Sequence, residues 1–125
     1  METQDKQRQL AEFWRDYSKQ LSNSIRYAEA LKAAERAVKL DDRDADGWYI
    51  KGTCLAMLAR YSEALADFEH ALTLDAQFVP AWDGKAWVLG ILKQKDAALE
   101  AVNKALELDP GYPEALKRKK RLEAL

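Results

Sequence analysis

The chain holds one thiol and one imidazole, Cys54 and His70, which are the side chains best suited to nucleophilic chemistry. A catalytic pair would require the imidazole to reach the thiol and keep it as a thiolate. Cys54 falls within an apolar pattern, which indicates a buried and inert thiol, whereas His70 stands between Glu69 and Ala71 and is expected at the surface. One Cys and one His are also too few for a metal site built from these residues.

Three aspartates, Asp41, Asp42 and Asp44, form an acidic cluster. Carboxylates that bind calcium alternate along a loop, and this cluster lacks that spacing. The chain also has no glycine-rich loop of the kind that holds phosphates. We therefore predict that the protein is not an enzyme and uses neither a cofactor nor a metal.

Five consecutive cations run from Lys117 to Arg121. Such a run can bind nucleic acid or an acidic membrane, but five adjacent residues on a helix spread around its whole circumference. The net charge of −1 and the pI near 5.9 argue against nucleic acid as the partner. Three interpretations stay open: a solvated helix, a contact with an acidic peptide through Lys117, Arg118 and Arg121, or a nucleic-acid contact.

The composition predicts one helical domain over residues 1–125. Hydrophobic residues make up 48% of the chain and charged residues 33%, with only five Gly and three Pro. The polar first ten residues and the lack of a long apolar run predict no membrane insertion. With its single cysteine, the chain is expected to be a soluble, cytoplasmic protein of a reducing compartment.

The tryptophans Trp14, Trp48 and Trp82 recur every 34 residues. Two alanine sets and one aspartate set keep the same step: Ala30, Ala64 and Ala98; Ala37, Ala71 and Ala105; Asp41, Asp75 and Asp109. A shared period across several residue types indicates one structural unit copied three times. We expect the alanines to allow close helix contacts, and the tryptophans to fill the space between units.

Each unit contains two segments with helical periodicity. We expect helices over about 5–22 and 25–40 in the first unit and about 79–92 and 95–108 in the third, with a matching pair in the second. Ser62 and Asp96 are the expected N-caps of the second helices in units two and three. A further helix from Pro113 to Leu125 would cover the open end of the stack, since proline favours a helix start.

The spacing Trp48-x3-Gly52-x2-Leu55, followed by Tyr61-x2-Ala64-x3-Phe68-x2-Ala71, resembles a tetratricopeptide repeat. The other two units follow the same pattern. Lys51 and Lys85 depart from it, because the family usually has an apolar residue there; we expect their stems to cover apolar surface. The resemblance implies an all-α, right-handed α–α superhelix of three antiparallel helix pairs, with repeats at about 11–44, 45–78 and 79–112 and a capping helix at about 113–125.

The resemblance also implies a binding groove lined by the first helix of each pair. The expected groove has a basic N-terminal wall, an apolar and aromatic floor, one acid and a basic C-terminal wall. Its candidate residues are Arg15, Lys19, Tyr49, Ile50, Thr53, Asp83, Trp87, Lys117, Arg118 and Arg121, joined by Ser22, Asn23, Met57, Gly84 and Ile91. Trp87 lies off the 34-residue period, so it is either an anchor for a partner or a packing residue under the capping helix. Tyr49 has the same two interpretations, as a groove anchor or as ordinary surface cover.

One variety of this family binds the acidic tails of heat-shock chaperones through a carboxylate clamp of Lys, Asn and Arg side chains. The matching positions here hold Arg15, Lys19, Ile50, Pro80 and Gly84. Arg15 alone keeps the charge expected at its position, and arginine does not replace lysine at a tightly fitted site. We predict that the clamp is absent.

The sequence therefore predicts a protein–protein interaction module that binds a peptide or protein segment with apolar or aromatic and acidic groups. The expected state is a monomer. One alternative is a self-associating scaffold, such as a homodimer, in which two copies pack together through Phe13 and Tyr17. Another is a nucleic-acid binder that uses the basic helix. The chain could also be part of a longer repeat array or an idealised sequence.

Overall fold

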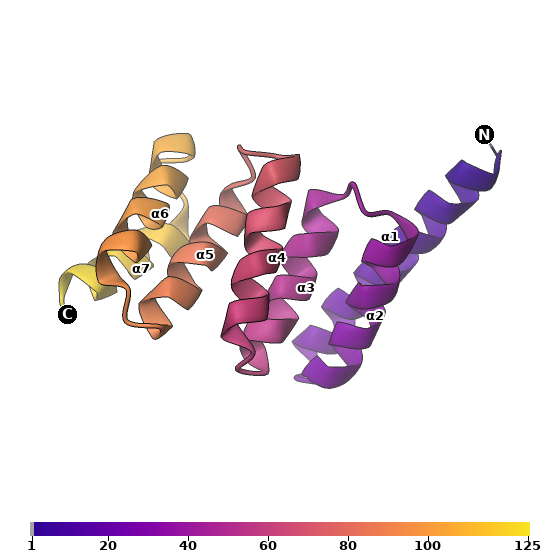
Figure 1. Cartoon of the computed structure of the whole chain (residues 1–125), viewed down its shortest axis with the longest axis horizontal. Helices are drawn as coiled ribbons and strands as arrows, with labels where there is room; N and C mark the ends of the chain where they lie inside the picture. The colour runs from indigo at the N-terminus through magenta and orange to yellow at the C-terminus, as the bar shows by residue number, and fades with distance from the viewer. Residues whose placement is uncertain (1) are drawn as a thin grey trace.

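A computed structural model describes residues 2–125, which form seven α-helices and no strand. Figure 1 shows them in a row from the N-terminus to the C-terminus. The helices are α1 (Glu2–Asn23), α2 (Tyr27–Leu40), α3 (Ala45–Met57), α4 (Tyr61–Leu74), α5 (Val79–Ile91), α6 (Lys95–Leu108) and α7 (Pro113–Glu123). The predicted all-α class is confirmed.

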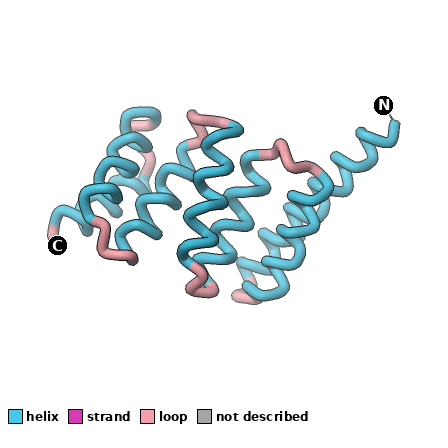
Figure 2. Tube along the Cα trace, in the orientation of Figure 1, coloured by secondary structure: helices cyan, strands magenta, loops and turns pink. Residues whose placement is uncertain are grey.

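The helices pack as three pairs and a cap. Helix α1 packs on α2, α3 on α4 and α5 on α6, and each second helix also contacts the first helix of the next pair. Helix α7 packs on α6 and α5. Helices α2, α4 and α6 lie on one side of the row, and α1, α3, α5 and α7 on the other (Figure 1). Short connections join neighbouring helices (Figure 2), so this arrangement is the helical repeat solenoid that the sequence predicts.

The periodic alanines lie at close contacts between helices, as expected. Ala30, Ala64 and Ala98 are completely buried. The hydroxyl of Ser18 on α1 donates to the Ala30 carbonyl at 2.7 Å, which requires the two helix backbones to approach closely. A larger side chain at these positions would push the helices apart.

Phe68 on α4 is the aromatic residue that fills the space between units. It is fully buried, and its ring touches the backbone of Gly52 on α3 and Gly84 on α5. A Cβ atom at Gly52 would lie 2.9 Å from the Phe68 Cε1 atom, and one at Gly84 would lie 2.8 Å from it. Both glycines therefore leave room for one ring.

The prediction for the periodic tryptophans is wrong in position. Each lies against the second helix of its own pair rather than between units, and each is only partly buried. The Trp48 ring contacts the tilted ring of His70, with centroids 4.1 Å apart. The Arg36 guanidinium lies 4.7 Å from the centroid of the Trp14 ring. The indole nitrogens of Trp48 and Trp82 also donate to carbonyls of the preceding inter-unit loops, at Asp42 and Ala76. In the second and third pairs, the indole thus attaches the pair to the loop that precedes it.

Lys51 and Lys85 lie over the rings of Trp48 and Trp82, with the ammonium groups 5.0 and 5.4 Å from the ring centroids. Each ammonium group thus makes a cation–π contact with the tryptophan of its own helix. That the lysine stems cover apolar surface stays a prediction. Lys51 also approaches Asp67, a buried carboxylate on α4, at 3.6 Å.

The turns within the pairs use a left-handed residue that is not glycine. Ile25, Ala59 and Lys93 each have φ = 61° and recur with the 34-residue period. One residue separates each left-handed residue from the next helix, so α4 begins at Tyr61 and α6 begins at Lys95. Ser62 and Asp96 therefore lie inside the first helical turn, and their predicted roles as N-caps are wrong.

The periodic aspartates shape the loops between pairs. The Oδ1 atom of Asp41 accepts from the backbone N–H of Arg43 at 3.1 Å, and Asp75 and Asp109 accept in the same way from the residue two places on. This short side-chain turn replaces a backbone turn and explains why aspartate repeats there. The acidic cluster at Asp41 is thus a structural turn.

Candidate functional site

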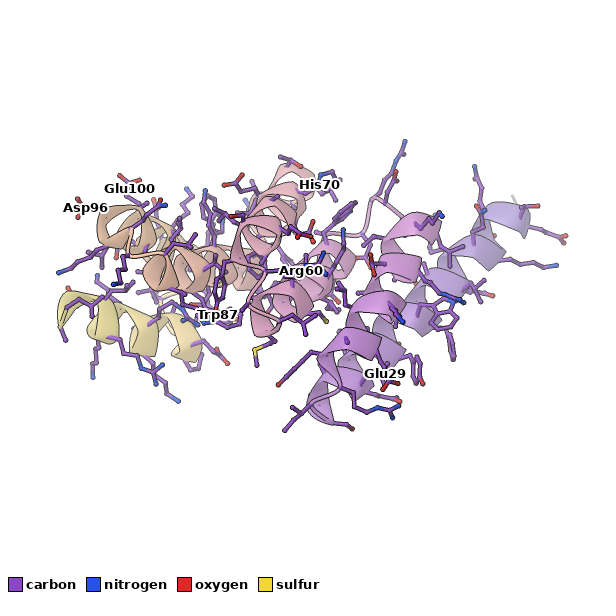
Figure 3. All side chains as sticks on the ribbon, turned by 60° about the horizontal axis from the view of Figure 1, so that its bottom comes forward. Glu29, Arg60, His70, Trp87, Asp96 and Glu100 are labelled. Atoms are coloured by element: carbon purple, nitrogen blue, oxygen red, sulfur yellow. The ribbon has the colours of Figure 1, made fainter. Side chains whose placement is uncertain are left out.

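The first helix of each pair, together with α7, presents the predicted groove residues on one side of the molecule. We call this the groove face: the surface of α1, α3, α5 and α7 that carries Arg15, Tyr49, Asp83 and Lys117 in successive units. These four positions are 34 residues apart and so occupy equivalent places on successive helices. Figure 3 shows Trp87 of α5 on this side, opposite His70, Asp96 and Glu100 on α4 and α6.

A pocket of about 260 Å³ opens between α1 and α3, and we call it the α1–α3 pocket. Its lining consists of Lys19, Ser22, Asn23, Tyr49, Ile50 and Thr53. The sequence placed all six in the groove, and the structure brings them together. Ile50 is buried and forms an apolar floor, whereas Asn23 and Lys19 are exposed at the rim.

Tyr49 is a fixed wall of this pocket. Its ring packs against Phe68, with centroids 5.8 Å apart, and meets Phe78 edge-on at 5.7 Å. The Thr53 hydroxyl donates to the Tyr49 carbonyl at 3.0 Å within α3. Burial raises the pKa of the Tyr49 phenol, so the side chain stays neutral at physiological pH. Tyr49 thus packs on the core as well as lining the pocket, and its role as an anchor for a ligand stays a prediction.

The basic wall at the N-terminal end of the groove face is neutralised from within. Arg15 donates to the Asp44 carboxylate at 2.9 Å and lies 3.7 Å from an oxygen of Asp46. Lys19 pairs with Asp46 at 3.1 Å. Burial lowers the pKa of Arg15, but the hydrogen bond and the charge of Asp44 raise it above the usual value. The cations predicted for this wall are therefore already paired with carboxylates of the fold, and their contact with a ligand stays a prediction.

Sequence reasoning missed Asp44 and Asp46 because they belong to the loop and first turn that begin the next unit. Asp44 caps α3 by accepting from the backbone N–H of Asp46 at 3.1 Å. An aspartate just before a helical segment is a recognisable cap.

The single acid of the groove face is also paired. Arg118 on α7 donates to both carboxylate oxygens of Asp83 on α5, at 2.7 and 3.1 Å. Asp83 is only 7% exposed, and the Arg118 guanidinium lies 6.0 Å from the centre of the Trp87 ring. These contacts attach α7 to α5. The two charges neutralise each other within the fold, and a role of Asp83 or Arg118 in ligand binding stays a prediction.

Trp87 lines a second pocket, of about 250 Å³, between α5 and α7, which we call the α5–α7 pocket. The two interpretations of Trp87 are compatible, because the half-buried indole packs under Arg118 and also faces this hollow. The other lining side chains that matter here are Ile91, Arg118, Arg121 and Leu122. The sequence placed Ile91, Arg118 and Arg121 among the groove residues, but not Leu122.

Lys117 and Arg121 are the groove-face cations left unpaired among residues 2–125. Both side chains are exposed, and no described carboxylate lies within 4.0 Å of their charged nitrogens. Helical geometry places residues four apart on one face of α7. The basic wall at the C-terminal end of the groove face is therefore available to an acidic ligand.

The thiol and the imidazole do not form a site. Cys54 is buried and contacts the Ser18 and Ser22 hydroxyls at 3.8 and 3.6 Å, which confirms the buried thiol. His70 is exposed beside Trp48, which confirms its surface position.

In the part of the chain that the structure describes, no group of three or more His, Cys, Asp or Glu could hold a metal ion. No helix there is both long and apolar enough to cross a bilayer.

Comparison with solved structures places this arrangement among known repeat domains. The TPR domain of Arabidopsis OM64 matches with a TM-score of 0.89 and 19% identity, over 94% of this chain and 98% of that one. The TPR2B domain of yeast Sti1, in a complex with pHsp70, matches with a TM-score of 0.86 and 27% identity, over 93% and 98% of the two chains. The second TPR domain of human RPAP3, in complex with an HSP70 peptide, matches with a TM-score of 0.84 and 18% identity, over 96% and 98%.

Comparison by sequence gives the family. A search of curated protein sequences finds no match. Two family models described as tetratricopeptide repeat match residues 24–78 and 79–112, and together they span well over half of the chain. The second, third and fourth helices and the last pair thus carry the family pattern in sequence as well as in structure. The chain belongs to the tetratricopeptide repeat family.

Proposed function

We propose that this protein is an interaction module whose groove face binds a segment of a partner protein, and that it catalyses no reaction. The observation that carries the proposal is the α1–α3 pocket, where side chains from two helices converge on one hollow of about 260 Å³. A concave site with an apolar floor and a few polar groups is the usual form of a ligand site. The similar yeast Sti1 domain, in its complex with pHsp70, supports a peptide as the kind of ligand.

The chemistry of the pocket favours an apolar side chain held by neutral polar contacts. Ile50 and the Tyr49 ring supply the apolar surface, and Ser22, Asn23 and Thr53 supply hydroxyl and amide groups. An asparagine amide both donates and accepts, so it matches a peptide bond of an extended segment. Because Lys19 is already paired with Asp46, this end of the groove face gains little from an acidic residue of the ligand.

The pairing of these cations within the fold argues against a partner whose acidic tail would be bound by a carboxylate clamp. Arg15 and Lys19 have carboxylate partners at 2.9 and 3.1 Å, and Gly84 lies under the Phe68 ring. A ligand carboxylate at this end would have to displace Asp44 or Asp46 and leave a buried or half-buried acid without a partner. We propose that the partner is recognised at its apolar residues there.

Selection from a library of random twelve-residue peptides tests this function. The wild-type protein should enrich peptides that share one apolar position, and Thr53→Phe, which fills the α1–α3 pocket, should weaken their binding at least tenfold. Thr73→Phe is the matched control, because Thr73 is an exposed threonine on α4, outside the groove face. If no peptide is enriched, or if both variants bind the enriched peptides equally, the proposed function is wrong.

Self-association through α1 is a second candidate, favoured by exposed apolar side chains on that helix. Leu10 is 49% exposed and Phe13 57% exposed, and Phe13 stacks on Tyr17 with ring centroids 6.2 Å apart. A second copy could cover this surface. Sedimentation equilibrium over a hundredfold concentration range decides: a single mass of one chain eliminates this candidate, and a dimer that Phe13→Ser abolishes would support it.

A further inference from the structure

The α5–α7 pocket combines apolar walls with cations at its edge. Trp87, Ile91 and Leu122 supply the apolar walls, and Arg118 and Arg121 lie at the rim. Ile91 is 41% exposed, so part of a large aliphatic side chain is open to solvent at this pocket. The pocket exists partly because Gly90 has no side chain: a Cβ atom there would lie 3.2 Å from the Leu122 Cδ2 atom.

The two cations at this rim differ in what they can do. The charge of Arg118 is already matched by both oxygens of Asp83, at 2.7 and 3.1 Å. Arg121 is exposed one helical turn further on, and Lys117 lies one turn before Arg121 on the same face of α7. Neither has a described carboxylate within 4.0 Å. One unpaired cation, Arg121, therefore lies at the rim, and a second, Lys117, lies one helical turn away on α7.

The two ends of the groove face thus have different electrostatic character. The two predicted groove cations on α1, Arg15 and Lys19, have aspartate partners at the start of α3, Asp44 and Asp46. Lys117 and Arg121 on α7 have none among residues 2–125. Charge complementarity steers a ligand into one orientation when only one end attracts its charge.

We propose that the α5–α7 pocket binds an aliphatic side chain of a partner peptide, and that Arg121 and Lys117 pair with acidic residues on either side of it. This inference rests on the proposed groove function and adds the chemical class and the orientation of the ligand. The apolar residue supplies the burial against Trp87 and Ile91, and the acidic residues select the α7 end over the neutralised α1 end. Exposed ion pairs weaken with salt, so binding at this pocket depends on ionic strength more than binding at the α1–α3 pocket does.

A titration followed by NMR of isotope-labelled isoleucine and leucine methyl groups tests the inference. The probe is a ten-residue peptide that alternates glutamate and leucine and is capped by acetyl and amide groups. Three matched peptides replace every glutamate by glutamine, every glutamate by lysine, or every leucine by serine. We expect the glutamate–leucine peptide to shift the methyl signals of Ile91 and Leu122, with a Kd at least tenfold lower than that of the lysine peptide or the serine peptide.

Charge reversal on α7 separates a local contact from general attraction. Arg121→Glu should raise the Kd of the glutamate–leucine peptide at least tenfold, whereas Lys120→Glu should change it less than twofold. Both variants change the net charge by the same amount on neighbouring exposed residues, but only Arg121 lines the pocket. Gly90→Leu should abolish the shifts at Ile91 by filling the hollow. Because Arg121 is exposed, its variant tests the contact without disturbing the core.

Three outcomes would overturn the inference. The first is that the peptide leaves the Ile91 and Leu122 signals unchanged. The second is that Arg121→Glu and Lys120→Glu weaken binding equally, which would mean general attraction to the basic run. The third is that a single-stranded DNA of twelve nucleotides displaces the peptide with a lower Kd. If peptides then still bind at Thr53, the groove function stands and this inference alone fails; if peptides bind at neither pocket, both fail.

Discussion

At the scale of residues, most of the charged side chains predicted to line the groove face are paired with another side chain of the protein. Arg15, Lys19, Asp83 and Arg118 are each matched by a partner within the fold. Two residues with buried carboxylates, Asp83 and Asp67, show how much the partner matters. Asp83 has a two-pronged arginine contact, whereas the Oδ2 atom of Asp67 has no hydrogen-bond partner and meets Lys51 only at 3.6 Å.

Removing the arginine partner of Asp83 should be costly. We expect Arg118→Met to lower the free energy of unfolding by about 3 kcal/mol, because a nearly buried carboxylate loses its counter-charge. The matched control is Lys120→Met, an exposed cation on the same helix, for which we expect a change of less than about 0.5 kcal/mol. Urea unfolding of both variants measures the difference, and equal effects would mean that the Asp83 pair does not hold α7 in place.

Removing the poorly paired Asp67 should stabilise the protein. The equivalent positions in the other units are Ala33 and Ala101, both buried. Burial raises the pKa of Asp67 above the ordinary value of 3.8, and the nearby Lys51 only partly offsets this. A raised pKa means that the folded state holds the proton more tightly, so this group stabilises the fold at low pH. That contribution is lost as the pH rises from about 3.8 through the folded-state pKa.

We therefore expect Asp67→Ala to raise the free energy of unfolding by about 1 kcal/mol at pH 7. The gain should shrink as the pH falls toward 4, where the wild-type carboxylate becomes protonated in the folded state. Thermal unfolding at pH 4, 5.5 and 7 measures this trend. A variant that is less stable at pH 7 would show that the Lys51 contact outweighs the burial of the charge.

At the scale of elements, the residue types that recur every 34 positions recur for different structural reasons. The alanines mark where paired helices approach, and the aspartates close the loops between pairs. The left-handed residues Ile25, Ala59 and Lys93 close the turns within pairs. Sequence reasoning found the helices and the alanine contacts. It placed the turns but missed their left-handed residues, because left-handed positions normally reveal themselves through glycine or asparagine, and none of these three residues is either.

Ile25 is the least suitable of the three turn residues, because a β-branched side chain at φ = 61° is strained. Its side chain is 74% exposed, so replacing it removes little packing. We expect Ile25→Asn to raise the free energy of unfolding by about 1 kcal/mol, whereas Ile25→Val keeps the branch and should bring no gain. Thermal unfolding separates them, and a loss of stability in the asparagine variant would contradict the strained turn.

Two glycines in equivalent helices should respond to alanine with opposite signs. A Cβ atom at Gly84 would lie 2.8 Å from the Phe68 ring, whereas one at Gly47 would lie 3.4 Å from the nearest Val38 atom. We expect Gly84→Ala to lower the free energy of unfolding by about 2 kcal/mol through overpacking. Gly47→Ala should raise it by about 0.5 kcal/mol through helix propensity. Urea unfolding checks both values, and a neutral Gly84→Ala would show that Phe68 is not the wedge between units.

At the scale of the whole molecule, the fold could be predicted from the sequence more fully than the site. Three copies in register reveal the stack, because each unit buries its apolar face only against its neighbours. The groove residues were implied by the resemblance to the repeat family, and six of them line the α1–α3 pocket. The ion pairs could not be predicted from the sequence. Asp44 and Asp46 contact the first helix of the preceding unit, and Arg118 on α7 contacts Asp83 on α5. Such contacts depend on how units stack, which the pattern within one unit does not encode.

The central claim is that the groove face, with the α1–α3 pocket as a subsite, binds a peptide segment. The most direct measurement is an NMR titration of the labelled protein with the most strongly selected peptide, read at every assigned backbone amide and methyl group. We predict the largest shifts at Ser22, Asn23, Ile50 and Thr53, with smaller shifts along α5 and α7. Largest shifts on α2, α4 and α6, or at Leu10 and Phe13 of α1, would contradict the claim and place the interaction surface elsewhere.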